Sequence, residues 1–287
     1  MELGVYGLNT KAAIGPVDAA RLVALVEELG YRSWWAGDHV VLPSPRTPDS
    51  PVEATEAILD PLVNLSFVAA HSTTLELGTA IIILPQRNPL ILAKQAASLD
   101  VLSNGRLLLG VGVGYLEPEL RALGVTLSER GARTDEYLAA MRTLWSDPKP
   151  AYQGRYVTID GIDAYPRPVT EHGPRIVIGG HSPAAFRRAV SSGHGWTGNG
   201  SSPDDLAKHL EGLTRAADEV ERPAWLGKLE INFMPLDPAL NPVEIEPADA
   251  RRYAELGLDR LLVYPLPLED VTDIEAFLRR HATLPRG

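Results

Sequence analysis

The sequence contains no cysteine among its 287 residues. Disulfide bonds, thiolate metal ligands and cysteine nucleophiles are therefore excluded. Basic residues are also scarce: 27 Lys and Arg stand against 37 Asp and Glu, which gives a net charge of −10. This balance argues against nucleic acid as a partner. No uncharged apolar run reaches the roughly 18 residues that a membrane span needs, so no membrane partner is expected.

Two signals of particular kinds of site are missing as well. No pair of histidines stands at metal-ligand spacing, and no G-x-S-x-G elbow for a serine nucleophile is present, so we expect no metal. The chain starts at once with a strand-like run, without a basic region and an apolar stretch before it. We therefore expect no secretory signal and a cytoplasmic location.

What the sequence does contain is a regular alternation of strands and helices. Eight apolar or β-branched runs are each followed by a stretch with apolar residues at helical spacing. The predicted strands are 3–8, 31–37, 75–84, 106–113, 176–178, 195–196, 227–234 and 258–264. The predicted helices are 18–29, 61–72, 89–103, 129–145, 183–193, 203–221, 247–256 and 270–282.

Eight such units favour an α/β fold of the closed (β/α)8 TIM type, with residues 1–287 as one barrel domain. The alternative is an open doubly wound sheet, whose usual count is five or six strands. Three connections are long: 39–59 is rich in proline and predicts a mobile lid, 114–127 a short helix, and 148–174 a hairpin that turns at Gly154. The first two are insertions after strands 2 and 4, on the face where barrel enzymes build their sites.

The segment from Pro174 onwards, P-R-I-V-I-G-G-H-S-P, predicts an anion site. The strand stops at Gly179 and Gly180, where a backbone can turn sharply and approach a ligand. Ser182 is a good helix N-cap and Pro183 suits the first helical position. Free N–H groups and the positive end of the helix dipole would face the ligand. An ordinary strand-to-helix turn is the alternative.

Two further patterns follow predicted strands. Gly110, Gly112 and Gly114 alternate in R-L-L-L-G-V-G-V-G and share one side of the strand, where either a planar ring or a tightly packed neighbour would lie. Asp38 and His39 follow strand 2, and we expect His39 to exchange a proton with the substrate and Asp38 to orient it. The alternative is a loop cap followed by a surface histidine.

With these residues, the chain resembles the bacterial luciferase-like superfamily, and within it the branch of coenzyme F420-dependent oxidoreductases. The most specific blocks are G-V-G-V-G-Y…E, E-R-G-A-R-T-D-E and I-G-G-H-S-P…G-x-G-W. The resemblance covers most of the first two hundred residues, through 4–9, 35–39, 78–89, 105–119, 129–145, 152–156 and 176–196. It implies a TIM-type barrel with a flavin or deazaflavin at its C-terminal mouth.

The resemblance also implies roles for single residues. Asp38 and His39 would border the ring and the substrate pocket. A cis peptide bond without proline, against one face of the ring, would join Ala80 and Ile81, beside Thr79. The implied contacts of the ring system and ribityl chain on strand 4 are Gly112 and Gly114. The implied phosphate-binding residues are Gly179, Gly180, His181, Ser182, Thr197 and Gly198.

Departures from the family pattern reduce the range of substrate classes that we expect. Sugar-phosphate dehydrogenases of the F420 branch carry an acidic residue where this chain has Tyr115, and a tryptophan where it has V-V-L-P at 40–43. The apolar lid favours a hydrophobic or small carbonyl substrate. Beyond the phosphate, the small polar residues 198–202 would leave an exit for the anionic tail of F420, with Arg187 or Arg188 facing it.

The resulting prediction is an enzyme that transfers a hydride between bound F420 and a small organic substrate. One alternative is a monooxygenase that uses reduced FMN. The other is a flavin-binding barrel without turnover. The sequence does not decide the oligomeric state, and a homodimer stays open.

Overall fold

The computed structural model describes residues 1–265 and 268–287. Within them, eight parallel strands close into a barrel, because β1 pairs with β11 and β3 with β5. The strands in order around the barrel are β1 (Glu2–Tyr6), β2 (Ser33–Ala36), β3 (Glu76–Thr79), β5 (Leu107–Gly112), β8 (Arg175–Gly179), β9 (Gly195–Gly200), β10 (Glu230–Pro235) and β11 (Arg260–Val263). The predicted (β/α)8 TIM-type barrel is confirmed.

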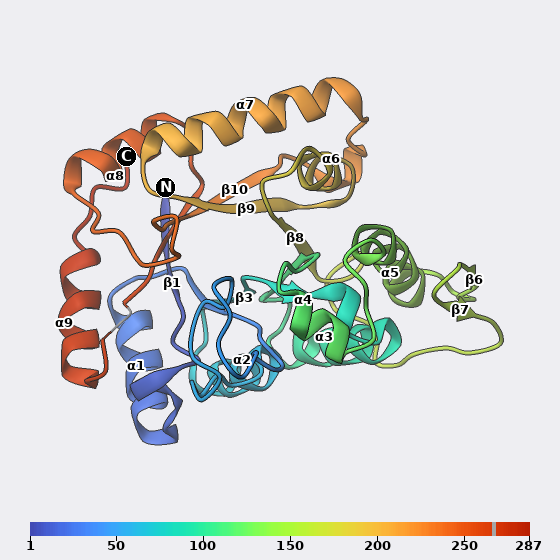
Figure 1. Cartoon of the computed structure of the whole chain (residues 1–287), viewed down its shortest axis with the longest axis horizontal. Coiled ribbons are helices and arrows are strands. Elements are labelled where there is room, and N and C mark those ends of the chain that lie inside the picture. Colours follow the sequence, from blue (N-terminus) through green and yellow to red (C-terminus); the bar gives the residue numbers. More distant parts are fainter. Residues whose placement is uncertain (266–267) are drawn as a thin grey trace.

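A helix follows each barrel strand and covers its outer side (Figure 1). These helices are α1 (Pro16–Glu28), α2 (Pro61–His71), α3 (Pro89–Leu102), α5 (Arg130–Ser146), α6 (Pro183–Ser192), α7 (Pro203–Glu219), α8 (Pro247–Glu255) and α9 (Val271–His281). Most begin with proline, whose fixed φ suits the first helical position. No helix in the described ranges is both long and apolar enough to cross a bilayer.

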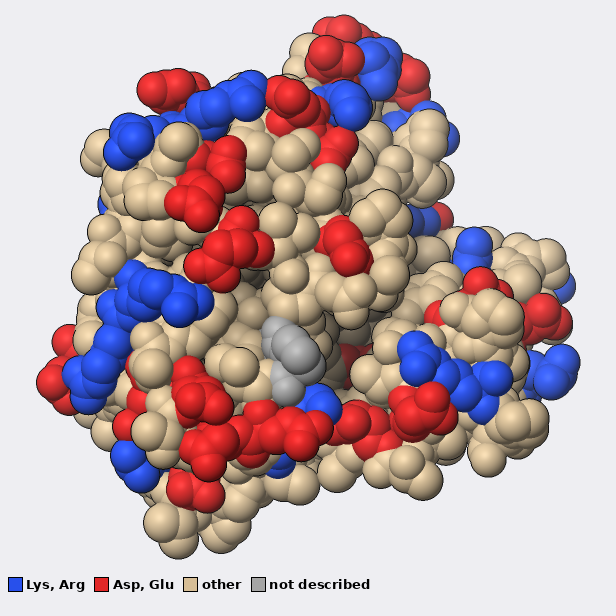
Figure 2. All heavy atoms as spheres, turned by 60° about the vertical axis from the view of Figure 1, so that its left-hand side comes forward, with Lys and Arg blue, Asp and Glu red and all other residues tan. Residues whose placement is uncertain are grey.

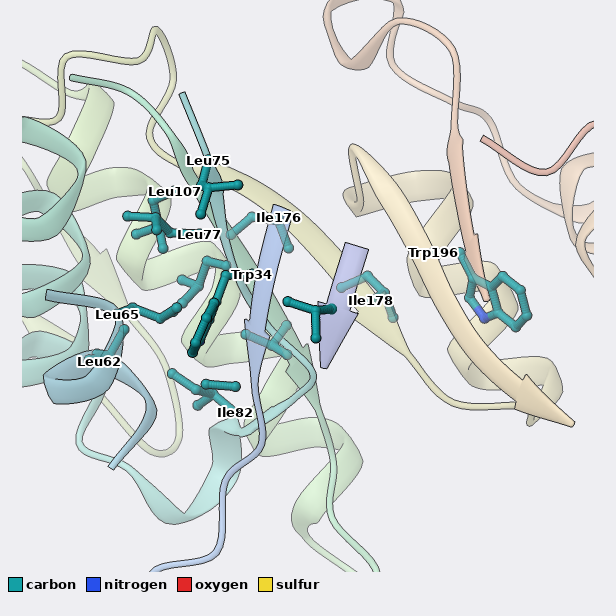
Figure 3. Close-up of a cluster of buried hydrophobic side chains, with 14 of the residues drawn as sticks. Trp34, Leu62, Leu65, Leu75, Leu77, Ile82, Leu107, Ile176, Ile178 and Trp196 are labelled. Carbon is teal, nitrogen blue, oxygen red and sulfur yellow. The ribbon is translucent and has the colours of Figure 1, made fainter. Parts of the chain in front are cut away.

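Two neighbouring tryptophans show how the strands divide the core. Trp34 points outward and joins the cluster between strands and helices, where its Nε1 donates to Oδ1 of Asn64 on α2 at 3.2 Å (Figure 3). Trp35 points into the barrel, and its Nε1 donates to Oγ of Ser33 at 2.8 Å. Successive residues of a strand face opposite sides, so one dipeptide serves both layers.

The N-terminal end of the barrel is filled by a buried ionic network. Arg260 is 2% exposed and pairs with Glu76 and Glu230. Its guanidinium also lies 5.5 Å from the ring centroid of Trp35. Since charged and aromatic side chains occupy this end, the C-terminal end is where the barrel can admit a ligand.

The third barrel strand departs from the single predicted run over 75–84. It divides into β3 and β4 (Ile82–Ile83), separated by a cis peptide bond between Ala80 and Ile81. The resemblance implied a cis bond at this position, and it is confirmed. The 3-10 helix η2 (Leu84–Gln86) then leads to α3.

Two other strands differ in length from their predictions. β9 extends to Gly200 because its last residue pairs with Pro235 of β10, so Gly198 and Asn199 belong to the sheet and not to a loop. β10 begins only at Glu230, after the 3-10 helix η3 (Ala224–Leu226).

Two of the three long connections contain the elements predicted for them. The loop after β5 holds the short helix α4 (Glu117–Ala122), and β6 (Tyr152–Gln153) and β7 (Thr158–Ile159) form the predicted hairpin around Gly154. The loop 39–59 is held at its base by Asn9, which follows β1 and is 1% exposed. The Asn9 side-chain amide donates to the carbonyl oxygens of Gly37 and Leu59 at 3.0 and 2.9 Å.

Candidate functional site

His39 lies at the C-terminal end of β2 and is held by a buried carboxylate. Its Nδ1 lies 2.9 Å from Oε2 of Glu119 on α4. Oε1 of Glu119 accepts from the backbone N–H of Val40 at 2.7 Å and from Nε2 of Gln86 at 3.2 Å. Because Oε1 already accepts two hydrogen bonds, we assign Oε2 as the acceptor of a proton on Nδ1 of His39. Nε2 is then the ring nitrogen left to exchange a proton, and the side chain is 17% exposed.

Asp38 does not orient His39, contrary to the prediction. Its carboxylate takes two bonds from Arg87, at 2.6 and 3.2 Å, and one from the backbone N–H of Ile83 at 3.1 Å. Burial raises the pKa of Asp38, although the bonds from Arg87 and Ile83 oppose this shift. The two side chains point to different elements. That of Asp38 is buried against β4, and that of His39 faces α4. Asp38 therefore ties β2 to the bulge after β3.

Tyrosines surround the inner side of this site. Tyr6 and Tyr264 follow each other around the barrel and pack edge to face, with ring centroids 4.9 Å apart. Burial, with smaller contributions from Tyr115 and Asp38, raises the pKa of Tyr6 to about 12. The Tyr6 hydroxyl is therefore protonated at neutral pH and able to donate a hydrogen bond. Tyr115 lies edge to face with His39, with centroids 6.4 Å apart, and is 47% exposed.

The alternating glycines of β5 leave room for residues 79–83 of the neighbouring strand, and their predicted contact with a ring stays a prediction. A Cβ on Gly110 would lie 1.7 Å from the carbonyl oxygen of Thr79. A Cβ on Gly112 would lie 2.6 Å from Cδ1 of Ile81, and one on Gly114 equally close to Cγ2 of Ile83. Tight packing, the alternative given above, therefore accounts for all three glycines. The side chain that faces the mouth at this point is Ile81.

The turn between β8 and α6 has the geometry of an anion site. Gly180 has φ of +117°, a conformation that glycine adopts without strain. Ser182 is the N-cap, and its Oγ accepts from the N–H of Ala185 at 3.2 Å. The backbone N–H groups of Gly180, His181 and Ser182 donate to no residue of the described ranges. Three unpaired donors at the positive end of a helix fit a phosphate group.

The remaining predicted phosphate-binding residues come from β9 and meet this turn. Thr197 pairs in register with Gly179. Gly198 leaves room for the ring of His181, whose Nε2 would lie 3.1 Å from a Cβ at that position. Nε1 of Trp196 donates to the carbonyl oxygen of Gly180 at 2.8 Å, which fixes the orientation of that peptide group. The six predicted residues therefore lie together.

The next helix start contrasts with this one. At the beginning of α7, Asp205 accepts from the backbone N–H of Ser201 and from the hydroxyls of Ser201 and Ser202. Its bonds with Lys208, Ser201 and Ser202 lower the pKa of Asp205 to about 2. A carboxylate of the chain itself thus occupies the end of α7, whereas the first turn of α6 holds no acidic residue.

The predicted contact of Arg187 or Arg188 with an anionic tail is not supported. Arg188 is buried, and its Nε donates to Oδ1 of Asp135 at 2.6 Å. Arg187 pairs with Glu219 of α7 at 2.9 Å. Both side chains lie on the sides of α6 that face other helices, which helical periodicity from Ser182 did not reveal.

Sequence reasoning missed several residues that the barrel brings to the mouth. Glu119 lies eighty positions after His39, and only the final E of the block G-V-G-V-G-Y…E signalled it. Arg87 gave no signal beyond its place after a predicted strand, and Tyr264 none beyond its place at the end of one. No group of metal-binding side chains occurs in the described part of the chain. The face drawn in Figure 2 is hollowed near its centre, above a band of acidic side chains.

Comparisons with known proteins show the family of the chain. The model of the luciferase-like monooxygenase family matches residues 1–236. An uncharacterized protein of Mycobacterium tuberculosis is 30% identical over 292 residues, which cover 98% of each chain. The F420-dependent glucose-6-phosphate dehydrogenase of Kineococcus radiotolerans is 31% identical over 185 residues, covering 63% of this chain and 52% of that protein.

Solved structures agree on the architecture. The monooxygenase RslO1 of Streptomyces bottropensis superposes with a TM-score of 0.80 at 20% identity and covers 99% of this chain and 98% of its own. An F420-dependent secondary alcohol dehydrogenase, solved with an F420–acetone adduct, gives a TM-score of 0.78 at 19% identity and covers 96% and 97%. The family model covers most of the chain, so the chain belongs to the luciferase-like monooxygenase family and is an oxidoreductase.

Proposed function

We propose that the protein is an F420-dependent oxidoreductase that interconverts a small, uncharged alcohol and its carbonyl compound. The observation that carries this proposal is the His39–Glu119 pair, which leaves one imidazole nitrogen available at the barrel mouth. When bound, the deazaflavin supplies the acceptor or donor of a hydride. The protein must then supply a binding site, exclusion of water and a group that takes or gives the hydroxyl proton.

His39 is the group that we assign to this proton. In alcohol oxidation its neutral Nε2 accepts the hydroxyl proton, and in carbonyl reduction its protonated Nε2 returns it. Glu119 is a positioning residue, because its carboxylate fixes the ring and stabilises the positive charge that His39 gains. The Tyr6 hydroxyl lies beside Gly37 at the end of β2, and we assign it as a hydrogen-bond donor to the substrate oxygen.

The cofactor would be held by neutral groups of the chain. The unpaired N–H groups of the 180–182 turn fit its phosphate, with Thr197 and Gly198 beside them. The ring would lie at the mouth over the bulge, against Ala80 and Ile81, with Thr79 behind them. Thr79 is fully buried, and its Oγ1 donates to the carbonyl oxygen of Gly110 at 2.7 Å, so its hydroxyl stabilises the bulge beneath the ring position.

The charge around the mouth favours an uncharged substrate. Arg87 is already paired with Asp38 and Asp60. Asp49 contributes to the raised pKa of Tyr115, and Glu56 to that of Tyr264, so two further acidic groups lie near the entrance. A phosphorylated substrate would be repelled by these acidic groups. This agrees with the apolar lid predicted from residues 40–43.

The choice of F420 over FMN is supported by relatives named as F420-dependent dehydrogenases. The alternative is a monooxygenase that uses reduced FMN, and it is favoured by solved monooxygenases with the same fold, one of them in complex with FMN. Both cofactors carry a planar ring and a phosphate, so the 179–182 turn serves either. The remaining alternative is a barrel without catalytic activity. It would bind one of the two cofactors but would neither oxidise an alcohol nor consume oxygen.

Titration of the purified protein with each cofactor decides between these functions. Fluorescence of F420 and of FMN reports binding, and reduction of F420 by a panel of small secondary alcohols reports turnover. The proposal predicts tight F420 binding and activity with uncharged alcohols, but none with glucose 6-phosphate. Tight FMN binding with oxygen consumption, and no F420 binding, would replace the proposal by the monooxygenase.

A further inference from the structure

Beside the anion site, one residue of β9 contacts two histidines through its backbone. The N–H of Asn199 donates to Nε2 of His181 at 3.0 Å. The carbonyl oxygen of the same residue lies 3.1 Å from Nε2 of His209 on α7. The two imidazole rings stack, with centroids 4.4 Å apart and planes inclined by 13°.

These contacts determine the tautomer of both rings. A backbone N–H can only donate, so Nε2 of His181 is unprotonated and its single ring proton lies on Nδ1. A backbone carbonyl can only accept, so Nε2 of His209 carries a proton. The usual ambiguity of histidine tautomers does not arise here, because neither partner can exchange roles.

The second ring nitrogen of His181 is placed for the anion site. Nδ1 is the ring nitrogen nearest the main chain, and the main chain of His181 is the centre of the 180–182 turn. Nδ1 has no hydrogen-bond partner in the ranges that the structure describes, whereas Nε2 is turned away toward β9. A neutral Nδ1–H donor therefore stands beside the three unpaired backbone donors.

We infer that His209, through the backbone of Asn199, positions His181 as a neutral Nδ1–H donor to the cofactor phosphate. His209 is a positioning residue in this arrangement and does not touch the ligand. The inference rests on the proposed phosphate site at residues 179–182, and it adds His209 to the residues that support this site.

The electrostatic surroundings agree with a neutral His181. Burial, reinforced by His209, lowers the pKa of His181 to about 4. Burial also lowers the pKa of His209, although the Asn199 carbonyl and Asp205 oppose this shift. The rings of Trp196 and Phe233 lie 5.6 and 6.3 Å from that of His209 and keep it in place.

Binding measurements with paired ligands test the inference. The ligands are F420 and the ribityl deazaflavin that lacks the phosphate and tail. In His209→Phe the ring stack remains but the Nε2–H is lost, and we expect F420 affinity to fall about tenfold, the effect of one misplaced hydrogen bond to a charged group. Affinity for the ligand without phosphate should not change. His209→Gln can still donate to Asn199 and should keep most of the F420 affinity.

The control is His71→Phe, which alters a histidine that stacks on Phe67 at the surface of α2. Ring-nitrogen NMR of the ligand-free protein gives a second, independent result: His181 should show the Nδ1–H tautomer in the wild type and a mixture in His209→Phe. An Nε2–H tautomer in the wild type, or unchanged F420 affinity in His209→Phe, overturns the inference.

Failure of the proposed function is distinguishable from failure of this inference. If neither F420 nor FMN binds the wild type, the proposed function fails. Titration with inorganic phosphate, followed at the His181 Nδ1–H resonance, then still decides the inference: a shift of that resonance that is lost in His209→Phe supports it, and no shift in the wild type overturns it.

Discussion

The carboxylate of Glu119 lies 2.9 Å from Nδ1 of His39, although the two residues belong to loops after different barrel strands. The helix α4 carries Glu119 and the end of β2 carries His39, so closure of the barrel brings them together. The contact uses the inner ring nitrogen and leaves the outer one for chemistry. The loop after β5 therefore orients the residue that the loop after β2 provides.

Substitution of His39 or Glu119 should lower the turnover number more than it lowers the affinity for the cofactor. We expect His39→Ala to reduce kcat by about 10²–10⁴-fold, the usual value of general acid–base assistance. Glu119→Gln keeps the acceptor and the volume but removes the negative charge, so kcat should fall at least about tenfold. Steady-state kinetics and cofactor titration measure the two effects, and a variant with wild-type kcat at every pH would remove its residue from the mechanism.

The helix start at Ser182 should not tolerate negative charge. Ser182→Asp keeps the N-cap but places a carboxylate beside the phosphate, so cofactor affinity should fall more than tenfold. Asn88→Asp is the matched control, because Asn88 caps α3 and accepts from the N–H groups of Leu90 and Ile91 in the same way. Equal affinity of both variants, measured by fluorescence titration, would show that no phosphate binds at α6.

The glycines of β5 should differ in their tolerance of alanine. Gly110→Ala drives a Cβ against the Thr79 backbone, which cannot move without opening the bulge, so we expect a loss of more than about 3 kcal/mol in the free energy of unfolding. Gly112→Ala meets only the end of the Ile81 side chain, which can turn away, so its loss should be smaller. Chemical denaturation compares the two, and equal losses would contradict the packing described here.

Local sequence patterns predicted most of the fold, but they predicted only part of the candidate site. The turn from Gly179 to Ser182 was predictable because a strand, two glycines and an N-cap are all consecutive. Glu119 and Arg87 were not, because each meets its partner across loops whose approach depends on closure of the barrel. The glycines of β5 show the same limit: alternation predicts a crowded side of the strand, but not whether a ligand or Ile81 fills it.

A homodimer stays a prediction, and the exposed apolar residues of α2 and α3 suggest where to test it. Val63 of α2 is 67% exposed, and Ile91 and Leu102 of α3 are 60% and 73% exposed. Light scattering should show a dimer that Leu102→Glu weakens. Val17→Glu on α1, where Val17 is 79% exposed, is the control and should leave the assembly unchanged. A monomeric wild type would exclude the dimer.

Acidification should destabilise the protein through His194, which precedes β9. Its Nδ1 accepts from the N–H of Ile176 at 3.0 Å, and burial, with nearby Arg142, Arg175 and Arg222, lowers its pKa to about 4. Between the unfolded pKa of about 6.5 and this value, the unfolded chain binds a proton that the folded chain does not. The His194 contribution to stability is therefore complete above about pH 6.5 and is lost as the pH falls toward 4. His181, whose pKa is lowered in the same way, adds an effect of the same sign.

Urea denaturation at a series of pH values between 7 and 4 measures this dependence. His194→Gln can still accept the Ile176 N–H bond but does not titrate, so the decline in its unfolding free energy with falling pH should be shallower than in the wild type. His71→Gln, which changes an exposed histidine of α2, should follow the wild-type curve. Parallel curves for the wild type and His194→Gln would show that His194 is protonated equally in the folded and unfolded states, and that its bond to the Ile176 N–H does not hold it neutral.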